Sequence, residues 1–438
     1  MKLNTGINSA FPSQMVSEEE KRTLDYGLLV GQAIEYEWFR GGRVNGSRWN
    51  TGYQNFHNLR LYARGEQSVQ KYKDELSING DLSYLNLDWK PVAIIPKFVD
   101  IVVNGIAVKD YDLKAFAQDP FSLQQRTNYV GAIYRDMQMQ KEIEQVKATT
   151  GISLYNSNSA VLPQSKEELE VHMQLNYKQS VEIAEEEAIN NTLAFNKYQL
   201  TKKRIVADIV TIGIGAIKTQ FNKSEGIVVE YVDPANLIYS YTNDPNFEDI
   251  YYVGEIKSLT IAEIKKQWPY LTDEELEKMV RYPGRDGYIA NPNYDRDLVQ
   301  ILFFEYKTFI DQVFKIKHTE QGLEKVLEKP DYFNPPPSDN FDRVSRSIEV
   351  LFSGAKVMGA PQMLEWKLAE NMTRPKSDLT KVNMNYVICA PNLYQGRIES
   401  LVSRCTSFAD MIQITSLKLQ QVIARMVPDG VFVDVDGL

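Results

Sequence analysis

Hydrophobic positions recur every seven residues along residues 396–427, a stretch that contains no proline. The first series consists of Ile398, Cys405, Ile412, Leu419 and Met426, and the second consists of Leu401, Phe408, Thr415 and Val422. A seven-residue spacing keeps side chains on one side of an α-helix and is typical of helices that pack side by side. The pattern predicts a helix of about 48 Å that ends before Pro428.

A third series on the same stretch is basic and consists of Arg397, Arg404, Lys418 and Arg425. Three interpretations are compatible with this stripe. The aliphatic stems could cover apolar surface while the charges stay in water. The charges could face a polyanion, or they could bridge to carboxylates of a neighbouring subunit.

Elsewhere the chain alternates between helical and strand-like patterns. Helices are predicted over 18–38, 53–76, 112–146 and 165–203, and the clearest strand alternation runs over 226–256. Further strands are predicted over 297–309, 312–317, 346–358 and 431–435. The expected class is therefore α+β, with long helices dominating.

Local signals add detail to this picture. A hairpin is expected across Ile310 and Asp311, and Pro269 should interrupt the helical pattern of 258–279. Gly213 and Gly215 are expected to end a helix and allow close packing rather than to bind a nucleotide. Ser165 followed by Glu168 predicts a helix cap. The acidic run at Glu182, Glu185, Glu186 and Glu187 is expected to face solvent.

The composition narrows the classes of function. The 438 residues carry a net charge of -9, and their number predicts two or more domains or one large irregular domain. The only cysteines are Cys389 and Cys405, which exclude a disulfide framework, and three scattered histidines do not predict a zinc site. The most apolar run, 205–217, is too short to span a bilayer. No catalytic or phosphate-binding motif is present, so we expect a non-enzyme without cofactor or metal.

Several segments, taken in order, resemble tailed-bacteriophage portal proteins of the short-tailed kind, similar to P22-like and crAss-like phage portals. They are YARGEQ at Tyr62, KPVAIIPKFVDIVVNGI from Lys90, GIGAIKTQF with the following 230–269, VQILFFEYKTF, IEVLFSGAKVMG and PNLYQGRIESLVSRCTSFADMIQITSLKLQQ. Together they cover most of residues 53–427. Their order along the chain carries the resemblance.

The resemblance implies a portal-type fold with a mixed α/β wing, a helical stem and a β-containing clip. On this template the wing takes residues 1–257, the first stem segment 258–281, the clip 285–392 and the second stem helix 396–427. Residues 428–438 would begin the return into the wing, in a chain expected to be truncated. Pro269 weakens the assignment of the first stem segment.

The resemblance also implies a ring of twelve subunits in the virion, assembled in the bacterial cytoplasm and placed at one capsid vertex. Double-stranded DNA would pass through it without sequence preference during packaging and ejection. The terminase and tail adaptor proteins would dock on the clip, the major capsid protein would hold the wing, and no membrane is involved. The channel residues would then be Arg397, Arg404, Lys418 and Arg425. The packing seam would be Ile398, Leu401, Cys405, Phe408, Ile412, Leu419 and Val422.

For the adaptor interface we expect the loop 330–339, with Tyr332 and Phe333, and the strand 346–358 to contribute. Trp366 is predicted as an aromatic anchor, although an ordinary core position is equally compatible with the sequence. Two alternatives to the portal function stay open: another ring or adaptor protein of the head-tail connector, and a soluble enzyme of unfamiliar fold.

Overall fold

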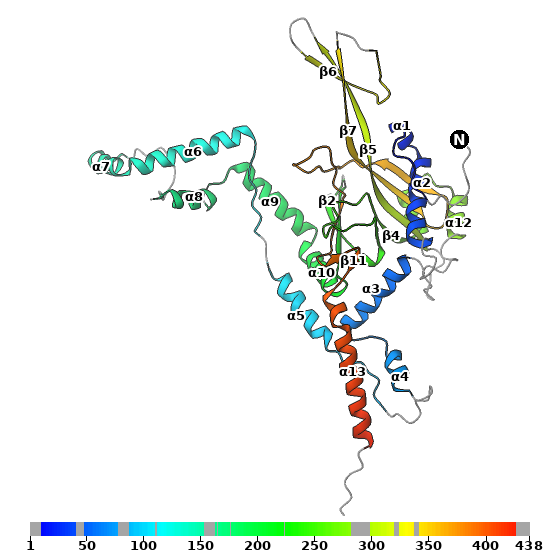
Figure 1. Cartoon of the computed structure of the whole chain (residues 1–438). Coiled ribbons are helices and arrows are strands. Elements are labelled where there is room, and N and C mark those ends of the chain that lie inside the picture. The colour runs from blue at the N-terminus through cyan, green and yellow to red at the C-terminus, as the bar shows by residue number, and fades with distance from the viewer. Residues whose placement is uncertain are drawn as a thin grey trace, which may run out of the picture. The chain divides into compact units, whose positions relative to one another are not determined.

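The structure, a computed structural model, describes residues 10–40, 48–77, 87–109, 112–152, 163, 165–175, 177–222, 224–281, 298–318, 324–336 and 341–425 (Figure 1). The chain forms two compact units, which we call the main unit (Met1–Val108 and Leu200–Leu438) and the insertion (Lys109–Gln199). Helices and antiparallel sheets are both present, which confirms the α+β class. The expected wing, residues 1–257, contains the whole insertion, and its end falls inside a strand.

The largest sheet belongs to the main unit and has the order β3–β4–β5–β7–β8, with β6 paired to β5. Its strands are β3 (Leu237–Tyr239), β4 (Tyr252–Thr260), β5 (Leu298–His318), β6 (Glu324–Lys329), β7 (Phe341–Val357) and β8 (Met363–Leu368). β5 and β7 are antiparallel over their whole shared length, from the pair Ile301 and Val357 to the pair Lys317 and Phe341. In Figure 1 this ribbon extends beyond the rest of the sheet and carries β6 near its end.

β5 is continuous through Ile310 and Asp311, so the predicted hairpin is wrong. In the sheet, Ile310 is paired with Ile348 and Asp311 with Ser347. A two-residue hairpin turn favours residues that accept positive φ, above all Asn-Gly and Asp-Gly. Ile-Asp lacks that preference, and the strand therefore runs on to His318.

The main unit contains most of the helices in the described part of the chain. They are α1 (Glu18–Lys21), α2 (Leu24–Glu35), the π-helix η1 (Tyr36–Arg40), α3 (Arg48–Arg64), α4 (Gln70–Leu76), α5 (Ile95–Ala107), α10 (Tyr198–Thr211), the 3-10 helix η2 (Pro234–Asn236), α11 (Ile261–Gln267), α12 (Asp273–Arg281) and α13 (Leu401–Arg425). α10 begins in the last residues of the insertion.

Helices cover both faces of the large sheet because successive side chains of a strand point to opposite faces. On β5, Leu302 and Phe304 pack in the cluster that includes side chains of α2. Val299 and Ile301 pack in the cluster formed with α11 and α12. The sheet is therefore the common core of the N-terminal helices and of residues 261–281.

The expected first stem segment, 258–281, is not a single helix. β4 continues to Thr260, whose side chain caps α11 together with Glu263. α11 ends at Gln267 and α12 begins at Asp273, so the predicted interruption at Pro269 is confirmed. Both short helices are packed against the sheet, and neither has the length of a stem helix.

Two smaller sheets lie between α10 and α13 in the chain. The first has the order β2 (Gly226–Val232), β1 (Gly215–Asn222) and β9 (Tyr386–Cys389), and the second pairs β10 (Leu393–Tyr394) with β11 (Arg397–Ile398). β2, β3 and β4 confirm most of the alternation predicted over 226–256. Gly213 ends α10 with φ +89, and a Cβ there would lie 2.8 Å from the carbonyl oxygen of Glu399. The predicted structural role of this glycine is therefore confirmed.

The insertion is helical in its described part. Its helices are α6 (Pro120–Gln138), α7 (Gln140–Thr150), α8 (Lys166–Leu175) and α9 (Ser180–Phe195). The single helix predicted over 165–203 is thus divided into α8, α9 and α10. The backbone N–H of Glu168 donates to the side chain of Ser165 at 3.1 Å, as the cap signal predicted.

Two glutamates of the acidic run do not simply face solvent. Glu182 is 4% exposed and accepts the N–H of Ala117 at 2.9 Å. Glu186 accepts the N–H of Ala115 at 2.9 Å. These carboxylates hold the segment before α6 against α9, whereas Glu185 and Glu187 are exposed as expected.

Candidate functional site

The candidate site is α13, which begins five residues later than the sequence predicted. Gln395 and Gly396 both have positive φ, and they form the turn that pairs β10 with β11. The helix is capped where the N–H of Ser403 donates to the side chain of Ser400 at 2.9 Å. Arg397 and Ile398 therefore lie in β11 and not on the helix.

One side of α13 faces the main unit and combines apolar and polar contacts. Val402 and Ala409 belong to the core that also includes residues of α3, α5 and β9. Farther along, Gln413 is 1% exposed, accepts the N–H of Val92 at 2.7 Å and donates to the carbonyl oxygen of Lys90 at 3.4 Å. The N–H of Asp88 donates to Gln420 at 3.2 Å. Two glutamine side chains thus fix the segment 88–92 along the helix.

Asp410 is the main ionic anchor of this side. Its Oδ1 accepts the hydroxyls of Tyr62 at 2.8 Å and Tyr72 at 2.7 Å, and it pairs with the Lys71 ammonium. Burial alone would raise the pKa of the Asp410 carboxyl, but the hydrogen bonds from Lys71, Tyr72 and Tyr62 outweigh it, and the pKa is lowered. α13 is therefore fixed to α3 and α4 by a charged group.

The opposite side of α13 carries most of the predicted seam and is uncovered in the single chain. Phe408 is 64% exposed, and Leu401, Ile412, Leu419 and Val422 are between 42% and 58% exposed. Met411 and Ile423, which the seven-residue series omitted, are also exposed. We call these seven side chains the α13 ridge: Leu401, Phe408, Met411, Ile412, Leu419, Val422 and Ile423. Cys405 is half-buried against the core and does not belong to the ridge.

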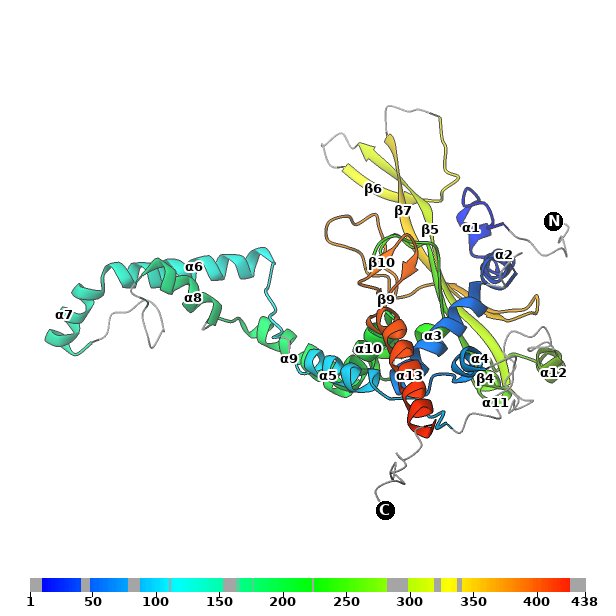
Figure 2. The same cartoon turned by 60° about the horizontal axis from the view of Figure 1, so that its bottom comes forward.

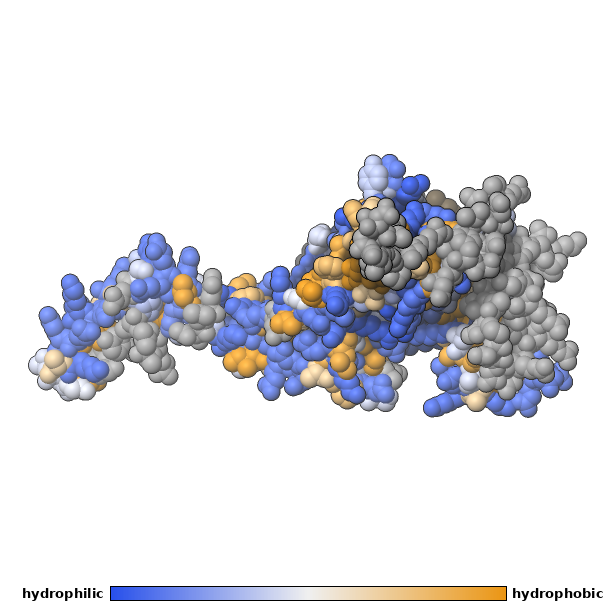
Figure 3. All heavy atoms as spheres, turned by 90° about the horizontal axis from the view of Figure 1, so that it is seen from below, coloured by the Kyte–Doolittle hydropathy of each residue, from blue (hydrophilic) through white to orange (hydrophobic). Residues whose placement is uncertain are grey.

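α13 projects from the main unit at the end where α3 and α5 also lie (Figure 1, Figure 2). Figure 3 looks onto this end of the molecule and shows hydrophobic residues there among the polar ones. α5 adds to this surface, because Phe98 and Ile101 are more than 60% exposed. α5 and α13 are in contact, so exposed apolar side chains occur on two neighbouring helices.

The basic stripe is only partly on the helix. Arg404 is exposed and pairs with Glu399 at 3.3 Å, and Lys418 is exposed without an ion pair to any described residue. Arg425 is the last residue of α13, and Arg397 is exposed on β11. Arg404 and Lys418 are fourteen residues apart, close to four helical turns, and so share one side of α13 with Met411, at the edge of the ridge.

The residues predicted for the adaptor interface do not form one surface patch. Trp366 is 7% exposed, its ring stacks on Phe352 with centroids 5.0 Å apart, and its indole N–H donates to the carbonyl oxygen of Lys21 at 2.8 Å. It is a core residue of the single chain, so the anchor interpretation is replaced by the core interpretation. Tyr332 is 74% exposed, and Phe333 is half-buried beside Arg343, which donates to its carbonyl oxygen.

A buried acidic pair, which the sequence analysis missed, joins the two larger sheets. Glu255 and Glu305 are 3% and 4% exposed. Tyr386 donates to Glu255 at 3.1 Å, and the backbone and side-chain nitrogens of Asn385 donate to Glu305 at 3.0 and 2.9 Å. Burial raises the pKa of the Glu305 carboxyl. Because the start of β9 supplies these donors, we assign the pair a structural role.

Other kinds of site are not found in the described part of the chain. No three His, Cys, Asp or Glu side chains there are grouped as metal ligands. None of the helices in those ranges combines the length and hydrophobicity needed to cross a membrane. The strand predicted over 431–435 and the expected return into the wing at 428–438 lie outside the described residues.

In comparisons with known proteins, no family model matches the chain, and no curated protein matches it.

Proposed function

We propose that the chain is a phage portal protein, a subunit of a twelve-membered ring at one capsid vertex through which double-stranded DNA is packaged and ejected. The observation that supports this most is the α13 ridge. α13 is fixed to its own chain on one side, and the exposed apolar side chains of the ridge lie on the other side. Large exposed apolar patches mark interaction surfaces. In a closed ring, every subunit presents such a surface to the next copy through a heterologous contact.

The proposed role of the basic stripe follows from its position beside the ridge. If the ridge packs against a neighbouring subunit, Arg404 and Lys418 lie at the margin of that contact. A few cations on an acidic protein would attract phosphates weakly and without regard to base sequence. Such an attraction suits a conduit, because DNA must keep moving. The chain itself is proposed to have no enzymatic activity.

The docking of partners is proposed for the β5–β7 ribbon and the loop after β6. Exposed side chains there include Val326 at 56% on β6 and Tyr332 at 74% in the loop after β6. Terminase and then tail adaptors would bind there, and the major capsid protein would contact another part of the main unit. Trp366 no longer belongs to this proposal, because it is buried.

Mass photometry of the purified full chain tests the assembly on which this function depends. We expect a species of about twelve subunits for the wild-type chain. Phe408→Asp with Leu419→Asp should abolish it, because each change places a charge in an apolar contact. The matched control is Leu379→Asp, another exposed leucine of the main unit, and it should assemble normally. Assembly of the double variant at wild-type level would contradict the proposal.

A further inference from the structure

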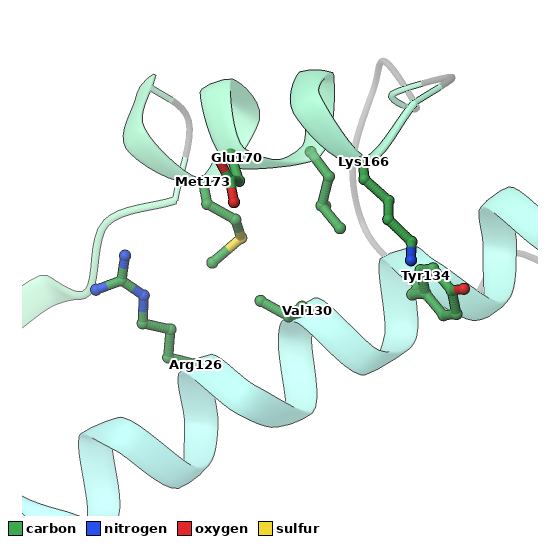
Figure 4. Close-up of a pocket in the computed structure, with 7 residues that line it drawn as sticks. Arg126, Val130, Tyr134, Lys166, Glu170 and Met173 are labelled. Atoms are coloured by element: carbon green, nitrogen blue, oxygen red, sulfur yellow. The ribbon is translucent and has the colours of Figure 1, made fainter.

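The insertion contains an open groove between α6 and α8 that no step of the proposed function uses. Its volume is about 420 Å³. Its lining residues are Arg126, Val130, Tyr134, Lys166, Leu169, Glu170 and Met173. The α6 residues are spaced by four, and the α8 residues by three or four, so each helix contributes one face. Figure 4 shows both sets of side chains directed into the space between the two helices.

The groove is apolar in its middle and basic at both ends. Figure 4 places Val130 and Met173 in the middle, and Leu169 is the third aliphatic or thioether side chain of the lining. Figure 4 places Arg126 at one end and Lys166 above Tyr134 at the other, where the Lys166 ammonium lies 5.9 Å from the ring centroid. Tyr134 lies eight positions after Arg126, which is about 12 Å along α6, so the two basic ends of the groove are separated by about that length of helix.

The insertion buries few large apolar side chains for its length. Among its described residues, the large hydrophobic side chains that are buried are Ile133, Ile143, Leu169 and Met173. Many others on its helices are exposed, such as Phe121 at 67% and Val171 at 53%. Helix bundles bury apolar side chains between neighbouring helices, and an amphipathic helix can bind in an apolar groove between two others.

We propose that this groove binds an amphipathic helix of a partner protein, with apolar side chains in its centre and acidic residues near both ends. The apolar face would pack on Val130 and Tyr134 and on the parts of Leu169 and Met173 that line the groove. The terminal carboxylates would pair with Arg126 and Lys166. Glu170 lies on the α8 wall between them and disfavours an acidic residue at the centre of the bound helix. This surface is independent of α13, so the inference does not depend on ring assembly.

Two synthetic helical peptides of about 15 residues serve as probes. They share the same leucines at positions i, i+4 and i+7 and differ only in glutamates or lysines at their ends. Fluorescence anisotropy with the full chain should show the glutamate peptide binding about tenfold more tightly. The difference should shrink in about 0.5 M salt, because exposed charges are screened.

Charge reversal then distinguishes binding in this groove from non-specific electrostatic binding elsewhere on the chain. In Arg126→Glu with Lys166→Glu, the lysine peptide should become the tighter ligand. Arg135→Glu with Lys141→Glu makes the same change of charge at exposed positions outside the groove and should keep the wild-type preference. Val130→Gln should weaken both peptides. Equal affinities in the wild-type chain, binding of neither peptide, or a preference that survives reversal at Arg126 and Lys166 would overturn the proposal.

Discussion

Asp410 joins α13 to α3 and α4 through one carboxylate, and its surroundings explain its ionisation. Two tyrosine hydroxyls and one ammonium donate to it. Hydrogen bonds to a charged acceptor each stabilise a fold more than neutral ones do. We therefore expect Asp410→Asn to lower the free energy of unfolding by about 1–2 kcal/mol, measured by denaturant unfolding. Asp273→Asn, which removes a carboxylate from an exposed pair, should change it by less than about 0.5 kcal/mol.

The pH dependence of stability gives a second test of Asp410. Because the folded pKa is lowered, its ionised form stabilises the fold above the unfolded pKa of about 3.9. This contribution is lost as the pH falls through the folded value. The wild-type chain should therefore lose stability more steeply than Asp410→Asn below about pH 4. Identical acid profiles of the two proteins would contradict the assigned anchor.

Trp366 is expected to act through stability and not through partner binding. Trp366→Ala should cost about 3–5 kcal/mol in unfolding free energy, because the indole fills the space between α2 and the sheet. Tyr332→Ala, on the exposed loop, should stay within about 0.5 kcal/mol and weaken adaptor binding instead. A stable Trp366→Ala chain with weakened adaptor binding would restore the anchor interpretation.

The sequence could not decide the role of Trp366, because its partners are remote in the chain. The indole hydrogen bond goes to Lys21, 345 positions away, and Tyr26 packs on the same ring. An aromatic residue in a strand-like segment has the same pattern whether it is core or interface. The buried pair Glu255 and Glu305 escaped notice because its hydrogen-bond donors are also remote in the chain. In addition, acidic residues are common in this chain, so no single pair stands out.

At the scale of elements, the periodic patterns predicted which helices and strands exist better than they predicted where these elements begin and end. The seven-residue spacing selected five of the seven ridge residues on α13, and the alternation over 226–256 predicted strands that the structure contains. The helix start was misplaced because the hairpin ending at Ile398 continues the same spacing. The turn signal of Gly396 could have corrected it. The continuity of β5 depends on pairing with β7, which no local pattern contains.

Reversing the charge of the three stripe residues on α13 distinguishes a contact with DNA from a contact between subunits. Arg404→Glu, Lys418→Glu and Arg425→Glu together should leave ring assembly intact while DNA packaging falls, if these residues face the channel. Glutamates at Lys266, Lys376 and Lys381, exposed positions outside α13 and outside the β5–β7 ribbon, form the matched control and should package normally. Packaging would be followed by protected DNA per particle, and assembly by mass photometry. Rings that fail to form would identify the stripe as contacts between subunits.

At the scale of the whole molecule, the division into two units was not predictable from the expected wing, stem and clip. The insertion begins and ends among helical patterns similar to those around it. The main unit, in contrast, is assembled from segments remote in sequence, because β4, β5, β7 and β8 share one sheet with helices from the N-terminal 40 residues. Long-range packing of this kind determines domain boundaries. The periodicity of residues along the chain contains no information about such contacts.

An electron cryomicroscopy map of the assembled full chain tests the central claim most directly. The account predicts a closed ring of about twelve copies, with the α13 ridge buried against the neighbouring subunit. It also predicts Arg404 and Lys418 at the wall of a central channel wide enough for duplex DNA. A ring whose α13 ridge faces solvent, or an assembly without a central channel, would contradict the account.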